Sequence, residues 1–245
     1  MTSNAKNFDD LVQSRRSVRI YDQDVEFDHG AVKRSLERAT LSPNSSNMQM
    51  WEFYRIKSDD LKKEVANLCM KQKAASTARE LVLFVVRPTL WKERASFNLE
   101  KMKSSFDEKP SMDDKSKKRA LSYYEKLIPT LYNNDKLGLK SVGKKIFAWA
   151  IGTKRPMVRQ VTKTDVRVTL HKSVSLAAMT FIYSMKAEGY DTCPMEGFDS
   201  KRVKKLLKLP KDAEISMIIG CGPAAEGGIY NERVRVPNDD VIFEL

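Results

Sequence analysis

Apolar residues occur along the chain as short alternating or unbroken runs, which predict strands separated by helices. Alternation over residues 51–56 predicts one strand, and the unbroken run from Leu81 to Val86 predicts a buried one. A further buried strand is predicted at residues 216–219, and a short terminal strand at residues 241–243. Strands that alternate with helices indicate a single α+β or α/β domain.

Helical periodicity accounts for most of the remaining sequence. A helix is predicted at residues 61–70, and Asp28 or Asp24 is expected to cap an earlier helix. Residues 170–186 are apolar around most of a helix's circumference, and Gly189 follows them. A helix of this kind is buried, either in the core or against another subunit.

The sequence changes character between residues 91 and 163. Charged helical sequence dominates at first, with a break at residues 109–114, and residues 136–163 contain basic but no acidic side chains. Because no linker or repeat divides the chain, residues 1–245 are predicted to form one domain with a variable helical insert at about 91–163. Within it, lysines alternate with apolar residues over 140–155, as in a helix that lies on an anionic membrane. A lid or dimer-covering helix with snorkelling lysines is the preferred interpretation.

Composition narrows the class of protein and its partners. The chain has 245 residues, of which 41% are hydrophobic, enough for a sizeable core. Its formal charge of +12 favours an anionic partner: nucleic acid, a membrane surface or a phosphorylated small molecule. Three widely spaced cysteines form no CxxC pair, no signal peptide is recognisable, and no apolar run is long enough to span a bilayer. A cytoplasmic protein is therefore expected.

Several catalytic signatures are missing. The two histidines, His29 and His171, are far apart, so no metal site is expected, and no GxSxG elbow, Walker loop or HExxH motif occurs. Residues 220–225 fit GxGxxA after a predicted strand, but too little chain follows for a dinucleotide-binding unit. This stretch is interpreted as the exit from a strand into a loop.

Two arginine clusters and one sharp loop carry the candidate chemistry. Arg15, Arg16 and Arg19 surround Ser17, and a second arginine pair stands near the C-terminus. Guanidinium groups form paired hydrogen bonds with phosphate, which a serine hydroxyl can supplement, although a solvated basic surface gives the same pattern. Pro194 and Gly197, three residues apart, predict a turn whose backbone can approach a flat ligand. The neighbouring Cys193 is expected to be a small packed residue rather than a reactive thiol.

Four blocks together resemble the FMN-dependent nitroreductase family and occur in the family's order. They are Arg15-Arg-Ser-Val-Arg19, Ser42-Pro-Asn-Ser-Ser-Asn-Met-Gln-Met-Trp51, Pro194-Met-Glu-Gly-Phe-Asp199 and Arg233-Val-Arg235. The resemblance covers residues 8–86 and 170–245 and leaves the insert outside it. It implies an α+β, nitroreductase-like fold with a mixed central sheet flanked by helices. It also implies an intertwined homodimer with one FMN in each of two pockets at the subunit interface.

The resemblance also assigns residues to the cofactor. The FMN phosphate and ribityl chain would be bound by Arg15, Arg16, Ser17, Arg233 and Arg235. Arg19 would lie near the pyrimidine end of the flavin ring, where reduction places negative charge that a guanidinium stabilises. The partner chain would contribute Ser45, Ser46, Asn47 and Gln49.

The remaining contacts would come from the sharp loop and from one glutamine. Pro194, Met195, Glu196 and Gly197 would run along the ring, with the N–H of Glu196 or Gly197 facing N5. Gln72 is expected to replace, by hydrogen bonding, a lysine or asparagine that the family often has at the pyrimidine edge. Because the hydride chemistry takes place at FMN N5, no catalytic side chain is expected.

The implied function is an NADH- or NADPH-dependent reduction of an electron-poor small molecule in a ping-pong hydride mechanism. Nitroaromatics, quinones and conjugated carbonyls are the expected acceptors. Two alternatives remain open. One is different flavin chemistry in the same family: dehalogenation, oxidative dehydrogenation or flavin breakdown. The other is a non-enzymatic basic protein that binds nucleic acid or a membrane surface, although no nucleic acid is expected as a partner of the enzyme.

Overall fold

The computed structural model describes residues 3–107, 112–133 and 139–245, so the predicted break at 109–114 lies partly outside the described residues. Its centre is a four-stranded sheet in the order β1-β2-β4-β3. The strands are β1 (Trp51–Ile56), β2 (Glu80–Val86), β3 (Asp191–Met195) and β4 (Glu214–Gly222). The three strands predicted inside the chain at 51–56, 81–86 and 216–219 are confirmed.

All neighbouring strands of this sheet run antiparallel. The only parallel pairing among the described residues is an isolated bridge between Ser17 and Thr192. The expectation of a mixed sheet is therefore corrected: the four strands are antiparallel, and the parallel component is limited to this bridge. The reason is that the segment around Ser17 pairs with β3 at one position and does not continue as a strand.

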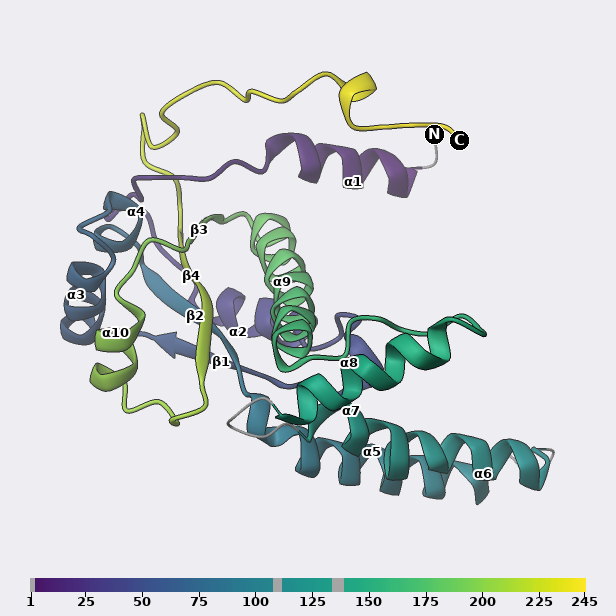
Figure 1. The fold of residues 1–245 in the computed structure, drawn as a ribbon. Helices are drawn as coiled ribbons and strands as arrows, with labels where there is room; N and C mark the ends of the chain where they lie inside the picture. The colour runs from purple at the N-terminus through teal and green to yellow at the C-terminus, as the bar shows by residue number, and fades with distance from the viewer. Residues whose placement is uncertain (1–2, 108–111, 134–138) are drawn as a thin grey trace.

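Helices cover both faces of the sheet (Figure 1). On one face lie α2 (His29–Ala39) and the long α9 (Lys163–Ala187), and on the other lie α3 (Asp59–Leu68), α4 (Lys73–Ser76) and α10 (Ser200–Leu206). Successive side chains of a strand point to opposite faces, so β2 sends Val82 and Phe84 toward α9 and Leu81 and Leu83 toward α3. This burial on both faces explains the unbroken apolar run of β2.

The helix predicted at residues 170–186 is the C-terminal part of α9. It begins earlier than expected because Thr162 and Asp165 form a capping box, in which each side chain accepts the other's backbone N–H. Gly189 follows the helix with φ +86°, a left-handed conformation that favours glycine. Phe181 is fully buried, whereas Val168 and Leu176 on another face are 44% and 48% exposed. One face of the helix therefore packs in the core, and another face exposes apolar side chains to solvent.

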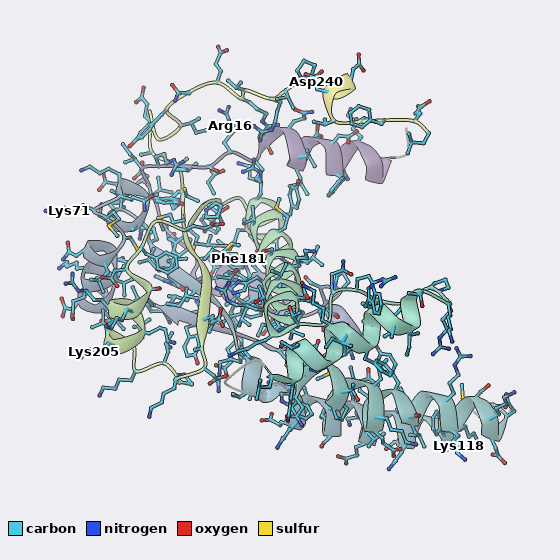
Figure 2. All side chains as sticks on the ribbon, viewed as in Figure 1. Arg16, Lys71, Lys118, Phe181, Lys205 and Asp240 are labelled. Atoms are coloured by element: carbon cyan, nitrogen blue, oxygen red, sulfur yellow. The ribbon has the colours of Figure 1, made fainter. Side chains whose placement is uncertain are left out.

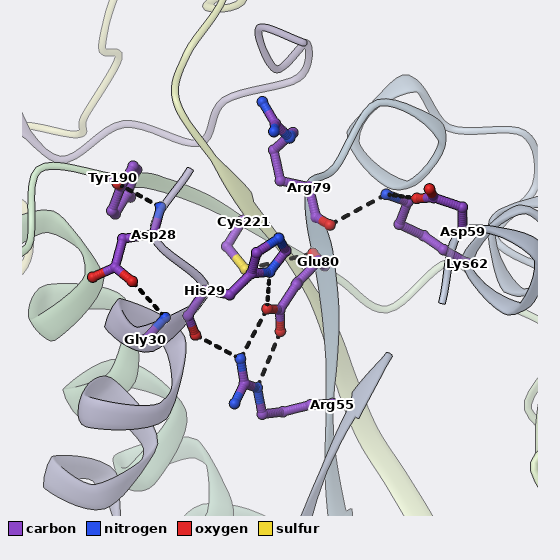
Figure 3. Close-up of polar contacts among 10 residues, drawn as sticks. All are labelled: Asp28, His29, Gly30, Arg55, Asp59, Lys62, Arg79, Glu80, Tyr190 and Cys221. Atoms are coloured by element: carbon purple, nitrogen blue, oxygen red, sulfur yellow. Dashed lines mark hydrogen bonds and ion pairs between the residues drawn. The ribbon is translucent and has the colours of Figure 1, made fainter. Parts of the chain in front are cut away.

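A buried carboxylate joins the sheet to α2. Glu80 is fully buried and receives two hydrogen bonds from Arg55, at 3.0 and 2.8 Å, while His29 Nδ1 lies 2.5 Å from its Oε1 (Figure 3). A charge in the core is tolerated only when it is paired in this way. The side chain of Asp28 accepts the N–H of Gly30, so Asp28 rather than Asp24 caps α2.

The segment between β2 and α9 is mostly helical in its described parts, with irregular residues at 153–162. After a short turn at Pro88–Leu90 come α5 (Trp91–Asp107), α6 (Asp114–Ser122), a π-helical turn (Tyr123–Leu127), α7 (Ile128–Tyr132) and α8 (Leu139–Gly152). On α8, four apolar side chains are each about three-fifths exposed: Val142, Ile146, Phe147 and Trp149. No helix in the described part of the chain is long and apolar enough to cross a membrane.

The two ends of the chain lie side by side at one edge of the molecule (Figure 1). They are α1 (Ser3–Ser14) and the irregular segment after β4, which contains one short turn at Asn238–Asp240. The predicted strand at 241–243 is wrong: these residues are irregular, and Phe243 is 72% exposed. In the described chain they have no neighbouring strand with which to pair.

Candidate functional site

Three segments that are distant in sequence converge beside the end of β3. The N–H of Val18 donates to the carbonyl of Thr192 at 3.1 Å, and the N–H of Arg19 donates to the carbonyl of Gly228 at 2.7 Å. The first arginine block is thereby fixed between β3 and the C-terminal segment. Backbone hydrogen bonds, which depend little on the side chains, thus define the position of the arginines.

The two arginine clusters line one cavity of about 260 Å³, which we call the arginine cavity. The rest of its wall is the C-terminal segment 229–234. The six predicted residues that line it are Arg15, Arg16, Ser17, Arg19, Arg233 and Arg235. The structure therefore brings together, within one chain, every residue predicted for the phosphate end and Arg19.

Five arginines and one acid, Glu232, line this cavity, so its wall carries a large excess of positive charge. Among the described residues, none of its five arginines has a carboxylate oxygen within 4.0 Å. Burial, and then the neighbouring charge of Arg233, lower the pKa of Arg15. The arrangement suits an anion with several oxygen acceptors, such as a phosphate monoester.

Two of these arginines also form hydrogen bonds between the C-terminal segment and the N-terminal part of the chain. Arg233 Nη2 donates to the carbonyl of Arg15 at 2.6 Å. It also donates to the carbonyls of Gln13 at 3.0 Å and Val12 at 3.3 Å, which lack partners within the last turn of α1. Arg16 donates to the carbonyl of Asn231 and lies between the two segments (Figure 2). The walls of the cavity are therefore held together by the same side chains that charge it.

The sharp loop predicted at residues 194–197 is shorter than expected: Pro194 and Met195 are the last two residues of β3, and only Glu196 and Gly197 follow the strand. Met195 is buried, whereas Pro194, Glu196 and Gly197 are exposed. Gln72 Nε2 donates to the carbonyls of Gly197 at 2.8 Å and Cys69 at 3.1 Å. The amide group of Gln72 therefore supports the loop and leaves its Oε1 as the atom able to accept a hydrogen bond from a ligand.

The loop at residues 45–49 lies against α9, away from the arginine cavity. None of its described residues lines the arginine cavity. The N–H of Ser45 donates to Ser173 of α9 at 3.2 Å. Ser46, Asn47 and Gln49 have φ values of 56°, 50° and 47°. Left-handed backbone at a residue other than glycine costs of the order of 1–3 kcal/mol and is concentrated at functional sites.

Residues of the insert hold this strained loop, and the sequence motifs did not identify them. Asn98 of α5 and Tyr123 and Tyr124 of the π-helical turn hydrogen-bond to Ser46 and Asn47. A buried asparagine and two adjacent tyrosines in an otherwise charged helical stretch were the available sequence signal. Their partners could be known only from the tertiary structure.

The three cysteines are fully buried. Burial raises the pKa of Cys69 to about 11 and raises the pKa values of Cys193 and Cys221. Cys193 precedes the sharp loop, but its thiol is enclosed, in agreement with the interpretation as a packed residue.

The sheet, its two helical layers and the arginine cavity define an α+β protein with a preformed, positively charged cavity. The chain belongs to the nitroreductase family, whose model matches residues 12–223. Nitroreductases are oxidoreductases that use FMN with NAD(P)H, so the expected enzyme class and cofactors are confirmed at the level of the family.

Similarity to individual proteins supports membership of this family. The chain is 24% identical to protein DrgA of Synechocystis over 229 residues, 93% of this chain and 89% of that protein. It is 25% identical over 235 residues to YdgI of Bacillus subtilis, named as an NAD(P)H nitroreductase, with 94% of each chain covered. A nitroreductase of Exiguobacterium sibiricum, crystallised in complex with FMN, has the same fold, with a TM-score of 0.67, 21% identity and 97% of each chain covered.

Proposed function

We propose that this protein binds FMN and uses NADH or NADPH to reduce electron-poor small molecules such as nitroaromatics, quinones and conjugated carbonyls. The observation that carries the proposal is the arginine cavity, in which five guanidinium groups converge without a carboxylate partner among the described residues. A phosphate monoester supplies the missing negative charge. Membership of the nitroreductase family supports the flavin as the group that carries it.

In this proposal the phosphate and ribityl chain are bound by Arg15, Arg16, Ser17, Arg233 and Arg235. Arg19 lines the cavity, acts electrostatically on Cys193 of β3, and would provide positive charge toward the ring. Pro194, Met195, Glu196 and Gly197 would run along the ring. Gln72 would accept a hydrogen bond through Oε1, because its Nε2 already donates to the loop.

When bound, FMN supplies the two-electron chemistry that links the nicotinamide to the acceptor. The residues of the chain bind and orient it. The arginines would fix the phosphate, and the exposed turn at Glu196 and Gly197 would leave room beside the ring for a second molecule. Because donor and acceptor would use the same space in turn, steady-state rates are expected to give the parallel-line pattern of ping-pong turnover.

We also propose a homodimer in which Ser45, Ser46, Asn47 and Gln49 reach the flavin bound by the partner chain. These four residues do not line the arginine cavity of their own chain, which fits a contribution to the site of a second copy. Apolar side chains are exposed on α1, α9 and the C-terminal segment, among them Phe8, Leu176 and Phe243. A second copy of the chain would cover this surface.

The experiment that tests the function is a visible absorbance spectrum of the purified protein before and after anaerobic addition of NADPH or NADH. A yellow protein that bleaches is the expected result. A colourless protein that takes up no added FMN would contradict the proposal. Family membership favours the enzyme over a basic nucleic-acid or membrane-surface binding protein, and different flavin chemistry within the family would appear as bleaching with another acceptor preference.

A further inference from the structure

The loop at residues 45–49 has a backbone conformation that its own sequence does not favour. Ser46 and Asn47 are both left-handed, with φ values of 56° and 50°, and neither is a glycine. Within the loop, the N–H groups of Asn47 and Met48 bond back to Asn44 and Ser45. Among the described residues of the loop, none donates to the carbonyl of Ser46, and the carbonyl of Asn47 has one local donor, Gln49 Nε2 at 3.2 Å.

The insert supplies a donor to each of these two carbonyls. Tyr124 Oη donates to the carbonyl of Ser46 at 2.9 Å, and Asn98 Nδ2 donates to the carbonyl of Asn47 at 2.7 Å. The hydroxyl groups of Tyr123 and Ser46 lie 2.6 Å apart, and Asn47 Nδ2 lies 3.5 Å from Asn98 Oδ1. The insert therefore contacts the carbonyl side of the turn at two consecutive residues.

The two donors are well placed to hold the turn. Asn98 is only 7% exposed, so a lost hydrogen bond there is not readily replaced by water. Burial raises the pKa of Tyr124, so its hydroxyl stays protonated and remains a donor. Tyr124 is the second residue of the π-helical turn, and such irregular turns are common at functional sites.

We propose that Asn98 and Tyr124 are positioning residues that hold the loop 45–49 in its flavin-binding conformation, and so make FMN affinity depend on the insert. This inference rests on the proposed function, since it assumes that the loop contacts FMN. Tyr124 is the only donor to the carbonyl of Ser46 among the described residues, and Asn98 adds a shorter bond to the carbonyl of Asn47 than Gln49 does. Loss of either insert donor favours right-handed conformations of the turn in which the loop no longer matches the flavin.

The test measures FMN affinity and loop protection in variants of the full-length protein. Tyr124→Phe removes only the hydroxyl group, and Asn98→Asp replaces the donor with an oxygen that faces the carbonyl of Asn47. The dissociation constant for FMN, from quenching of flavin fluorescence, is expected to rise about fivefold in Tyr124→Phe, the effect of one neutral hydrogen bond, and more in Asn98→Asp. Amide hydrogen exchange in residues 45–49 is expected to become faster in both variants without FMN.

Matched controls separate positioning from general stability. Tyr54→Phe loses a tyrosine hydroxyl that binds Glu52 on β1, and Asn67→Asp changes an exposed asparagine of α3. Neither control is expected to alter FMN affinity. Tyr124→Phe keeps its aromatic ring, so it still tests the proposal if Asn98→Asp fails to fold.

The outcomes distinguish this inference from the proposed function. Unchanged FMN affinity in a folded Tyr124→Phe variant would overturn the inference, whether or not exchange in the loop became faster, while FMN binding by the wild type would still support the function. A wild-type protein that binds no FMN would overturn the function and, with it, the positioning role.

Discussion

Each guanidinium group in the arginine cavity repels the others, and folding brings five of them together. The lowered pKa of Arg15 reflects this repulsion as well as burial. A ligand that binds only the folded state stabilises it, so an anion in the cavity both relieves the repulsion and raises the melting temperature.

Arg15→Gln is therefore expected to have opposite effects on the free protein and on its complex. The free protein should melt no lower than the wild type, because one repelling charge is gone. The dissociation constant for FMN should rise about 10- to 100-fold, the range for a lost hydrogen bond to a charged group. Thermal melting with and without FMN, together with a fluorescence titration, measures both.

Arg202→Gln on α10 is the control, because its side chain is 76% exposed and lies outside the cavity. It should leave the affinity for FMN unchanged. If both variants lost affinity equally, the effect would be one of net charge, and the assignment of Arg15 to the phosphate would be wrong.

The same residues show what the sequence could predict about the site. Arg15, Ser17 and Arg233 were recognisable because a phosphate site requires a local cluster of particular side chains. Asn98 and Tyr124 were not recognisable, because they act on residues 51 and 78 positions earlier in the chain. Which of many polar side chains meets the strained loop is decided by packing alone.

The contact between α2 and α9 depends on one carboxylate. Glu188, directly after α9, accepts hydrogen bonds from Arg34 and Arg38 of α2, each at 2.6 Å. These bonds lower its pKa from 4.5 to about 2. A carboxylate whose pKa is depressed by folding contributes stability above its unfolded pKa, and this contribution is lost as the pH falls through the folded value.

Glu188→Gln is expected to lower stability by about 1 kcal/mol at neutral pH, since solvent screens a surface ion pair. The difference from the wild type should shrink between pH 4.5 and pH 2, where Glu188 becomes protonated. Urea unfolding at a series of pH values measures it. Asp60→Asn on α3, where the side chain is 94% exposed, should have little effect at any pH. A constant difference for Glu188→Gln over the whole range would refute the ion-pair explanation.

Element prediction succeeded where burial imposes a clear pattern. β2 is covered on both faces and α9 is apolar around most of its circumference, so both were recognisable from composition alone. The strand predicted at 241–243 failed because a short apolar triplet does not identify a pairing partner, and the described chain offers none. The antiparallel direction of all four strands also depends on tertiary order rather than on local sequence.

At the scale of the whole molecule, the apolar side chains left on the surface of α9 form the clearest test of dimerisation. Leu176 is 48% exposed in the single chain, so a charge there should be tolerated by the monomer and destabilise an apolar interface. Leu176→Glu is expected to sediment as a monomer and to be purified with little flavin, whereas the wild type is expected to sediment as a yellow dimer.

Lys63→Glu on α3, at a side chain that is 76% exposed, provides the matched change to glutamate. It should remain dimeric and yellow. A Leu176→Glu variant that is dimeric with a full complement of flavin would exclude this face of α9 from the interface.

The overall charge of the chain did not identify the kind of ligand that it binds. A charge of +12 fits several kinds of anionic partner, and only its concentration in one cavity points to a phosphorylated ligand. The pairing of α1 with the C-terminal segment joins the two ends of the chain, a contact that no local pattern predicts. The position of the insert beside the 45–49 loop likewise follows from the fold.

The burial of all three cysteines has a chemical consequence for the proposed reaction. Quinones and conjugated carbonyls alkylate thiolates, so an enzyme that concentrates such molecules risks modifying itself. The thiols of Cys69, Cys193 and Cys221 are enclosed and have raised pKa values, and at neutral pH they stay protonated. Even Cys193, beside the loop predicted to border the flavin, is therefore protected from the electrophiles that the enzyme would consume.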